Sequence, residues 1–330
     1  MTRTIRWGIL GAARFARDHM APAIHAAEGA EFAALATADA ARAAPFRALN
    51  PALRLHDSYD RLLADPGIDA VYIPLPNHLH VEWTLRAIAA GKHVLTEKPV
   101  ALTAQEIDGL IHARDASGLV VAEAYMVVHH PQWRRARELV QSGAIGALRQ
   151  VDAVFSYDNR ADPGNIRNRP ETGGGGVRDI GVYPYGCARF VTGAEPETVE
   201  ARLQRENGVD VWAQATGLWA GPGGRFAFSA VTSMRQFPRQ EMTFHGDRGL
   251  IRLTAPWNPN VYGEARLDWH QPGHLVLTDR WPGVNHYKLQ VEAFGRSVRD
   301  GAPYPCPLEF SRGTQAMIDR VLAQGVEIAF

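Results

Sequence analysis

Short apolar runs alternate with amphipathic stretches through the first third of the chain. Five runs rich in β-branched residues are predicted as buried strands: residues 5–10, 32–37, 70–74, 93–96 and 119–122. Helices are predicted between them at 12–27 and 79–90, and from Thr103, where Glu106 completes a capping box. Strands that alternate with helices in this way predict a doubly wound parallel sheet. We therefore expect an α/β domain over residues 1–122.

Longer runs that alternate apolar and polar residues follow in the second part of the chain. Five of them are predicted as strands of a mainly antiparallel sheet: residues 151–157, 211–219, 225–232, 241–245 and 250–254. Turn residues such as the segment 221–224 separate them, and helical patterns at 289–299 and 311–323 close the chain. Residues 123–330 are therefore expected to form an α+β domain with a large open sheet.

Composition narrows the class of protein. The 330 residues carry 35 basic and 35 acidic side chains, so the chain lacks the positive charge typical of proteins that bind nucleic acid or membrane surfaces. Its two cysteines, Cys187 and Cys306, stand outside any CxxC pattern. Neither a leader peptide nor an apolar segment of about 20 residues is evident. We expect a cytoplasmic protein that binds neither nucleic acid nor membrane.

The first predicted strand runs directly into a turn that predicts dinucleotide binding. The turn follows the GxGxxG/A fingerprint with alanine at the second and third glycine positions: Gly11, Ala12, Ala13, Arg14, Phe15 and Ala16. Gly11 permits the tight turn, and the amides that open the following helix suit a pyrophosphate. Thr37 and Ala38, at the end of the second strand, are expected to line the adenosine ribose. Asp39 suits a free ribose and Arg42 a 2′-phosphate, so NADP and NAD both stay open.

Residues 69–99, DAVYIPLPNHLHVEWTLRAIAAGKHVLTEKP, resemble the family of glucose-fructose oxidoreductase, inositol dehydrogenase and MocA (Gfo/Idh/MocA). The likeness extends over nearly the whole chain, through the opening RWGILGAARFA, EAYM at 123–126, HPQ at 130–132, NIR at 165–167 and the glycine-rich segment 173–183. The chain is most similar to the family's sugar dehydrogenases and dimeric dihydrodiol dehydrogenases. The resemblance implies an NAD(P)-binding Rossmann domain followed by a domain for substrate binding and oligomerisation.

The resemblance also implies which residues surround the cofactor. It places Lys98 beside the nicotinamide as a catalytic residue, where its positive charge acts on a substrate hydroxyl. A position at the carboxyl end of a parallel strand, followed by the rigid Pro99, suits that role. Further residues expected at the cofactor are Pro74, Leu75, Asn77, His80 and Glu97. We expect no metal, because the family uses none and acidic partners at ligand spacing are absent.

The glycine run at 173–176 precedes Asp179 and Tyr183, which are four residues apart. On a helix this spacing places both side chains on one face, and the resemblance assigns both to the substrate. We expect Tyr183 to transfer or orient the hydroxyl proton and Asp179 to position the sugar, with the glycines allowing close approach of the backbone to a ligand. Tyr125 and Arg167 are expected to contact the substrate as well.

The resulting hypothesis is NAD(P)-dependent oxidation of a pyranose at C1, in a site between the two domains. The nicotinamide accepts hydride, Tyr183 with Lys98 takes the hydroxyl proton, and a lactone leaves. Alternatives are an aldose-aldose oxidoreductase with tightly bound NADP(H), a dehydrogenase of cyclic trans-dihydrodiols, a ketosugar reductase and, in a different class, a non-catalytic dinucleotide or sugar sensor.

Two departures from the family pattern leave the substrate open. Val127 and Val128 stand where an aromatic residue and an arginine are common, and Arg178 replaces an apolar residue just before Asp179. The broad sheet of the second domain would leave one face uncovered. We therefore expect association into a homodimer or homotetramer.

Overall fold

The computed structural model describes residues 3–329, and the chain divides into two compact units. Unit 1 comprises Met1–His129 and Asn285–Arg312, and unit 2 comprises His130–Val284 and Gly313–Phe330. The domain boundary expected after residue 122 precedes this division. The sequence pattern carried no sign that 285–312 belongs with the first unit.

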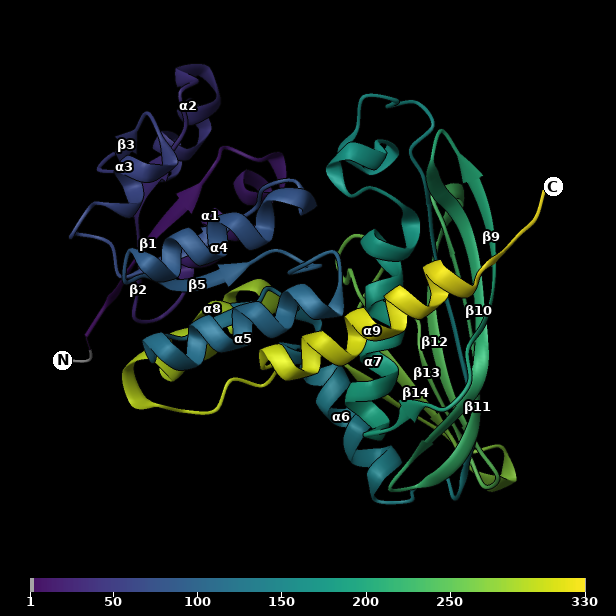
Figure 1. Cartoon of the computed structure of the whole chain (residues 1–330). Coiled ribbons are helices and arrows are strands. Elements are labelled where there is room, and N and C mark those ends of the chain that lie inside the picture. The colour runs from purple at the N-terminus through teal and green to yellow at the C-terminus, as the bar shows by residue number, and fades with distance from the viewer. Residues whose placement is uncertain (1–2, 330) are drawn as a thin grey trace. The chain divides into compact units, whose positions relative to one another are not determined.

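Unit 1 is built on a six-stranded parallel sheet in the order β3-β2-β1-β4-β5-β6 (Figure 1). Its strands are β1 Ile5–Leu10, β2 Ala30–Ala36, β3 Arg54–His56, β4 Ala70–Ile73, β5 His93–Thr96 and β6 Val121–Glu123. Its helices are α1 Ala21–Ala26, α2 Ala40–Leu49, α3 Tyr59–Leu63, α4 His80–Ala89, α5 Ala104–Ser117 and α8 His286–Asp300. This strand order is that of the Rossmann fold, so the predicted doubly wound sheet is confirmed.

Helices cover both faces of the parallel sheet. On one face, Ile24 of α1 and Phe294 of α8 are fully buried in one core cluster. On the other, Leu62 of α3 and Leu110 of α5 are fully buried in a second cluster. The central strands are therefore enclosed from both sides, which explains why their sequences are largely apolar, as in β4.

The helix predicted at 12–27 is interrupted. A π-helical turn, Ala16–Met20, precedes α1, and the N–H of Ala21 donates to the carbonyl of Ala16. Pro22 has no N–H to donate to the carbonyl of Asp18, so the regular pattern of hydrogen bonds cannot continue through this point. The same arrangement recurs at Val177–Gly181, a second π-helical turn, shortly before Pro184.

The predicted capping box of α5 is confirmed. The Thr103 side chain accepts from the N–H of Glu106, and the Glu106 carboxylate accepts from the N–H of Thr103. The helix ends at Gly118, whose φ of 68° suits glycine. The helix after β5 is thus bounded by local sequence signals alone.

Unit 2 contains a ten-stranded sheet in the order β15-β14-β13-β12-β7-β11-β10-β9-β16, with β8 paired to β10. The strands are β7 Leu148–Asp158, β8 Glu195–Pro196, β9 Glu200–Glu206, β10 Val209–Gly221, β11 Gly224–Ser233, β12 Arg235–Gly246, β13 Leu250–Leu253, β14 Arg266–His270, β15 Val276–Arg280 and β16 Val326–Glu327. Only the pairs β7–β11 and β9–β16 are parallel, so the predicted mainly antiparallel sheet is confirmed.

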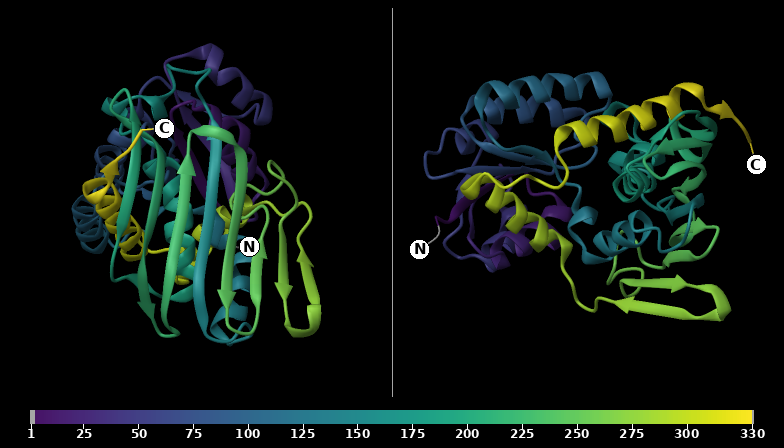
Figure 2. Two further views of the ribbon diagram at one scale, coloured as in Figure 1. Left: turned by 90° about the vertical axis from the view of Figure 1, so that its right-hand side faces the viewer. Right: turned by 90° about the horizontal axis from the view of Figure 1, so that it is seen from below.

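Helices cover one face of this second sheet. They are α6 Pro131–Gln141, α7 Val182–Thr192 and the part of α9 Leu308–Gln324 that belongs to unit 2. Every residue of α7 is buried, and its Tyr185 ring lies 6.1 Å from that of Phe228 on β11. Figure 2 shows the other face of the sheet without helices over it. Among residues 3–329 no helix is long and apolar enough to cross a membrane.

Candidate active site

The glycine-rich turn after β1 has the geometry of a phosphate-binding turn. Gly11 has a φ of 98°, which strongly favours glycine, and a side chain there would lie 3.1 Å from the Tyr59 hydroxyl. Ala12 is buried, Ala13 and Phe15 are half-buried, and Arg14 is exposed. A helix begins within this segment, so its first amides are available to an anion. The residues present therefore fit a dinucleotide.

Helix α2, which follows β2, places the positive charge of Arg42 beside this turn. Arg42 donates from Nη2 to the carbonyl of Ala12 at 2.9 Å. The carboxylate of Asp39 accepts from the amides of Ala41 and Arg42, so it caps helix α2. Thr37 is half-buried and Ala38 exposed. Asp39, which was considered for a ribose hydroxyl, thus has a structural role as a helix cap. Arg42, which was considered for a 2′-phosphate, lies at the phosphate-binding turn.

Hydrogen bonds of His80 support the predicted cofactor loop after β4. Pro74 and Asn77 are half-buried, whereas His80 is fully buried. Its two ring nitrogens each lie 2.7 Å from a carbonyl oxygen, one of Leu75 and one of Pro99. Burial lowers the pKa of His80 to about 4, although two carbonyl acceptors favour the doubly protonated ring. Because both nitrogens face the backbone, His80 joins the loop to the turn that carries the predicted catalytic lysine.

That turn, residues 97–100, is called the Lys98 turn below, and buried polar groups hold three of its residues. The amide of Lys98 donates to the Glu97 carboxylate at 3.2 Å, and the Tyr72 hydroxyl donates to the same carboxylate at 2.6 Å. The amide of Val100 donates to the Glu123 carboxylate at 2.9 Å. Pro99 is held through its carbonyl by His80, as described above. The backbone around the lysine is therefore fixed from several sides.

Two carboxyl groups surround the charge of Lys98. Burial raises the pKa of Glu97 and of Glu123, while the positive charge of Lys98 opposes this rise in both. Lys98 itself is half-buried. An ammonium in such surroundings provides a preorganised positive charge for a negatively charged oxygen.

Unit 2 brings three of its polar side chains together, and we call Tyr157, Arg167 and Asp179 the Asp179 cluster. The Tyr157 hydroxyl donates to Asp179 Oδ2 at 2.7 Å, and Arg167 Nε lies 2.8 Å from the same oxygen. The carboxylate raises the pKa of Arg167, and burial raises the pKa of Tyr157 well above its ordinary value. Arg167 thus stays a cation and Tyr157 a neutral donor, and both contact the Asp179 carboxyl group.

Tyr183 faces the same strand as Asp179. Its ring lies 5.7 Å from Phe155, two residues before Tyr157 on β7. Residues two apart on a strand share a face, so Asp179 and Tyr183 both face one side of β7. Trp257 stacks on Phe155, with 5.0 Å between ring centroids and 8° between planes. A buried aromatic cluster therefore adjoins the Asp179 cluster.

The glycine run has a role within the protein itself, whereas its expected close approach to a ligand stays a prediction. A side chain at Gly174 would lie 2.5 Å from the carbonyl oxygen of Arg167, and one at Gly175 would lie 2.3 Å from Asp210. The amide of Gly175 donates to the carbonyl of Arg167 at 2.9 Å. The glycines thus allow the chain's own backbone and the Asp210 carboxylate to approach closely, which places the segment that carries Arg167.

Two aromatic residues of this region were not singled out by the sequence analysis. Tyr157 lies in the predicted strand 151–157, and the alternation of that strand places it on the same face as Phe155, so the signal was present. Trp257 lies in an irregular segment between β13 and β14, where Gln240 Oε1 accepts from its amide at 3.2 Å. No periodicity marks such a position.

The predicted substrate residue Tyr125 is buried in unit 1, with its ring 6.2 Å from that of Phe310. His129 contacts the Tyr304 hydroxyl at 3.2 Å, and His130 accepts from the amide of Gln132. Within residues 3–329 the structure contains no group of three or more potential metal ligands.

Two family models match the chain. The first, described as an oxidoreductase family with an NAD-binding Rossmann fold, matches residues 5–125, and the second, the GFO/IDH/MocA C-terminal domain, matches residues 133–252. The chain belongs to the Gfo/Idh/MocA family. This membership confirms the resemblance seen in the sequence and makes the protein an oxidoreductase.

Relatives within the Gfo/Idh/MocA family act on sugars. A dTDP-3,4-didehydro-2,6-dideoxy-alpha-D-glucose 3-reductase of Saccharopolyspora spinosa is 35% identical over 97% of this chain and 95% of its own length. A D-xylose 1-dehydrogenase (NADP(+)) of Haloferax volcanii is 34% identical over 96% of this chain and 95% of its own length. A 3-ketoreductase from Actinomadura kijaniata, solved with NADP and TDP-benzene, is 29% identical with a TM-score of 0.88, covering 99% of this chain and 100% of that one.

Proposed function

We propose that the protein is an NADP-dependent dehydrogenase that oxidises a pyranose at C1 to a lactone. The Asp179 cluster carries the proposal. A carboxylate with a tyrosine and an arginine can bind several ring hydroxyls, and the stacked rings of Phe155 and Trp257, both buried, adjoin it. The xylose dehydrogenase among the relatives supports C1 as the position that is oxidised.

NADP is the proposed cofactor, with NAD as the second possibility. Arg42 reaches the phosphate-binding turn and offers a cation for a 2′-phosphate. The 3-ketoreductase with 29% identity was solved with NADP. When bound, the nicotinamide supplies the hydride acceptor.

In this proposal each polar group has a separate role. Asp179 holds the hydroxyls that orient the ring, and Arg167 keeps that carboxylate ionised. Tyr183 takes the proton of the C1 hydroxyl, and the charge of Lys98 stabilises the oxygen as it becomes negative. A sensor would not need this set of groups, so we favour an enzyme.

The test is a panel of aldoses, including D-xylose and D-glucose, incubated with NADP+ and separately with NAD+. We expect reduction of the nicotinamide with at least one aldose, and faster reduction with NADP+. The reduced nicotinamide is followed by its absorbance at about 340 nm. Formation of the lactone is checked by its hydrolysis to the aldonic acid. Absence of nicotinamide reduction across the panel would sink the C1 assignment.

A second candidate is reduction of a keto group on a nucleotide-linked sugar. It is favoured by the 35% identity to the dTDP-ketosugar 3-reductase and by the solved 3-ketoreductase. Consumption of NADPH with a TDP-linked 3-ketosugar, without activity on free aldoses, would establish it in place of C1 oxidation.

We also propose that the enzyme is a homo-oligomer in the cytoplasm. Leu218 is 37% exposed on the face of the unit 2 sheet that the helices leave uncovered, and the half-buried Val154 and Val231 pair across β7 and β11. Such a face is suited to a second copy. Light scattering on the eluted protein should give a mass of two or four chains; a mass of one chain would contradict it.

A further inference from the structure

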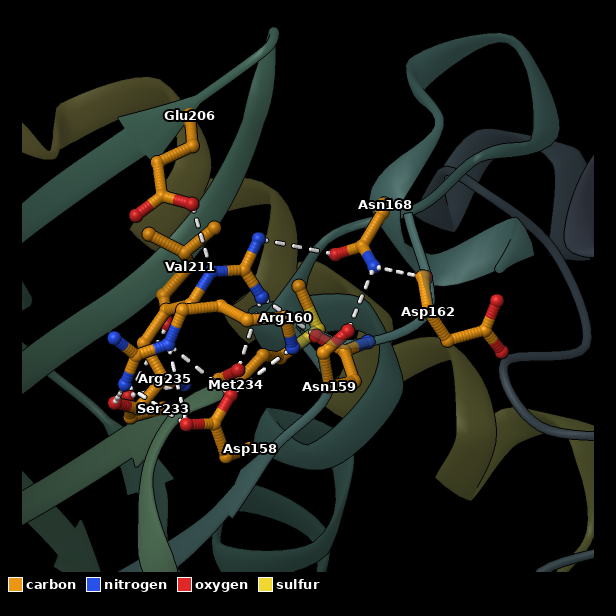
Figure 3. A network of polar contacts seen from close by, with 10 residues as sticks. All are labelled: Asp158, Asn159, Arg160, Asp162, Asn168, Glu206, Val211, Ser233, Met234 and Arg235. Carbon is orange, nitrogen blue, oxygen red and sulfur yellow. Dashed lines mark hydrogen bonds and ion pairs between the residues drawn. The ribbon is translucent and has the colours of Figure 1, made fainter. Parts of the chain in front are cut away.

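Arg235 opens strand β12, and its guanidinium contacts three side chains of unit 2 (Figure 3). Nε lies 2.7 Å from a carboxylate oxygen of Glu206 on β9. Nη1 donates to Asn159 Oδ1 at 2.5 Å, and Nη2 donates to Asn168 Oδ1 at 3.1 Å. The side chain is only 13% exposed. A cation that is this well enclosed and this fully bonded has one fixed geometry.

Both asparagines belong to the loop 159–171, which leads from β7 to the glycine run. Every residue of this loop is half-buried or exposed. Apolar burial therefore does not fix its course, and hydrogen bonds must do so. Asn168 Nδ2 donates to the carbonyls of Asn159 at 3.4 Å and Asp162 at 2.9 Å, which closes the loop on itself.

The loop places one member of the Asp179 cluster. Arg167 directly precedes Asn168, and its Nε lies 2.8 Å from Asp179 Oδ2. Its carbonyl accepts from the amide of Gly175, so its backbone is held on one side by the glycine run. On the other side the backbone is held through Asn168, which is bound by Arg235.

We propose that Arg235 is a positioning residue for substrate binding: it fixes the loop 159–171 so that Arg167 lies against Asp179. It does not belong to the cluster and acts through Asn168 and Arg167. The inference rests on the proposed function only in that Arg167 and Asp179 contact the substrate. Loss of the Arg235 side chain should therefore lower the affinity for the sugar and leave the reacting groups in place.

The chemistry of arginine is needed for this role. The planar guanidinium offers donors in a fixed fork, and here the fork reaches Glu206 with one nitrogen and two asparagines with the others. A lysine would keep the ion pair with Glu206 but could not hold both asparagines in this geometry. Arg235→Lys should therefore give an effect between those of the wild type and Arg235→Met.

The experiment is a double-mutant cycle of Arg235→Met and Arg167→Met, with the sugar KM and kcat measured at saturating nicotinamide. Arg235→Met should raise the sugar KM about tenfold, because charged hydrogen bonds are lost, and change kcat less than about twofold. In the Arg167→Met background the same substitution should change KM less than about twofold. Independent, multiplying effects of the two substitutions would overturn the proposal, as would an unchanged KM in Arg235→Met.

Arg239→Met is the matched control. Arg239 lies on the same strand, is 59% exposed, and its Nη2 is 3.8 Å from Glu241. We expect its sugar KM to equal that of the wild type, and a rise equal to that of Arg235→Met would overturn the assignment to the loop. Asn168→Ala keeps the contacts of Arg235 with Glu206 and Asn159 and removes the contact next to Arg167, so it tests the inference should Arg235→Met not fold. It should raise KM as Arg235→Met does, and an unchanged KM would contradict the proposal.

A second readout needs no substrate. Amides of residues 160–171 should exchange hydrogen faster in Arg235→Lys and Asn168→Ala than in the wild type, whereas equal rates would overturn the proposal. If the wild type turned over no pyranose, the proposed function would fail while this readout still decided the role of Arg235. The two failures are therefore distinguishable.

Discussion

The Lys98 turn and the Asp179 cluster are held in place in different ways. Buried groups from several elements hold the residues on both sides of Lys98: Tyr72 binds the Glu97 carboxylate, and His80 and Glu123 bind the backbone of Pro99 and Val100. Arg167, by contrast, has a side chain that is 39% exposed and lies on a loop with no buried residue among 159–171. The charge predicted to be catalytic is thus fixed by buried groups, and the proposed substrate contacts are fixed by a surface segment. This division suits a family in which relatives with different sugar substrates share a cofactor fold.

The largest effect is expected from Lys98→Met, which removes the positive charge from the turn. The kcat for sugar oxidation should fall about 10³-fold, because a preorganised charge is lost, while the Kd for NADP changes little. Stopped-flow or steady-state absorbance measures the first and fluorescence titration the second. Lys92→Met is the contrasting variant, since Lys92 donates to the carbonyls of Asp65 and Ile68 away from the turn. It should lower stability and leave the kcat of folded enzyme intact; comparable turnover in both variants would remove Lys98 from catalysis.

Gly175→Ala tests the support of the Asp179 cluster. Gly175 has a φ of 114°, and a side chain there would lie 2.3 Å from Asp210 Oδ1. We expect the free energy of unfolding to fall by about 3 kcal/mol from backbone strain and overlap. Gly109→Ala, in helix α5 with no atom near its added side chain, should instead gain about 0.5–1 kcal/mol. Urea denaturation measures the free energy of unfolding of both variants. Equal values would show that a glycine is not required at position 175.

Asp210→Asn tests the pH dependence of the same region. Burial raises the pKa of Asp210 to about 7 from an ordinary value of 3.8. The native carboxyl therefore retains a proton in this window that the unfolded chain has released, so the free energy of unfolding falls as pH rises from about 4 to 7. The asparagine oxygen can still accept from the Val177 amide, which now donates to Asp210 at 2.7 Å. Denaturation at several pH values should show Asp210→Asn gaining on the wild type toward pH 7, and parallel curves would disprove the assignment.

Tyr157→Phe gives the smallest expected effect. It removes one donor from Asp179 and keeps the ring, so the sugar KM should rise about tenfold or less, with kcat nearly unchanged. Tyr185→Phe, on the buried helix α7 and outside the cluster, is the control and should leave the KM as it is. Steady-state kinetics with both variants measures this, and a KM unchanged in Tyr157→Phe would show that its hydroxyl does not support the substrate contact.

Local sequence signals predicted most of unit 1. The apolar runs that became β1 and β5, the capping box at Thr103 and the turn at Gly11 each depend on neighbours in sequence. The short exposed strand β3 and the helices α2 and α3 were not predicted, because they have little apolar periodicity. For the site, Asp179 could be tied to a motif, whereas its partner Tyr157 is 22 residues away and joined to it only by the fold. The Arg235 network depends on pairings between distant strands and a loop, which no local pattern records.

The order of the two units along the chain limits how the enzyme can be truncated or joined with parts of a relative. Most of unit 2 is inserted between two segments of unit 1, and the later segment supplies Phe294, whose ring lies 5.0 Å from that of Trp7. A fragment that ends at residue 129 would leave Trp7 without this neighbour, so truncation should expose apolar surface and promote aggregation. A chimera that exchanges substrate specificity between relatives therefore requires two junctions, near residues 129 and 285, and must retain a helix α9 that continues from one unit into the other.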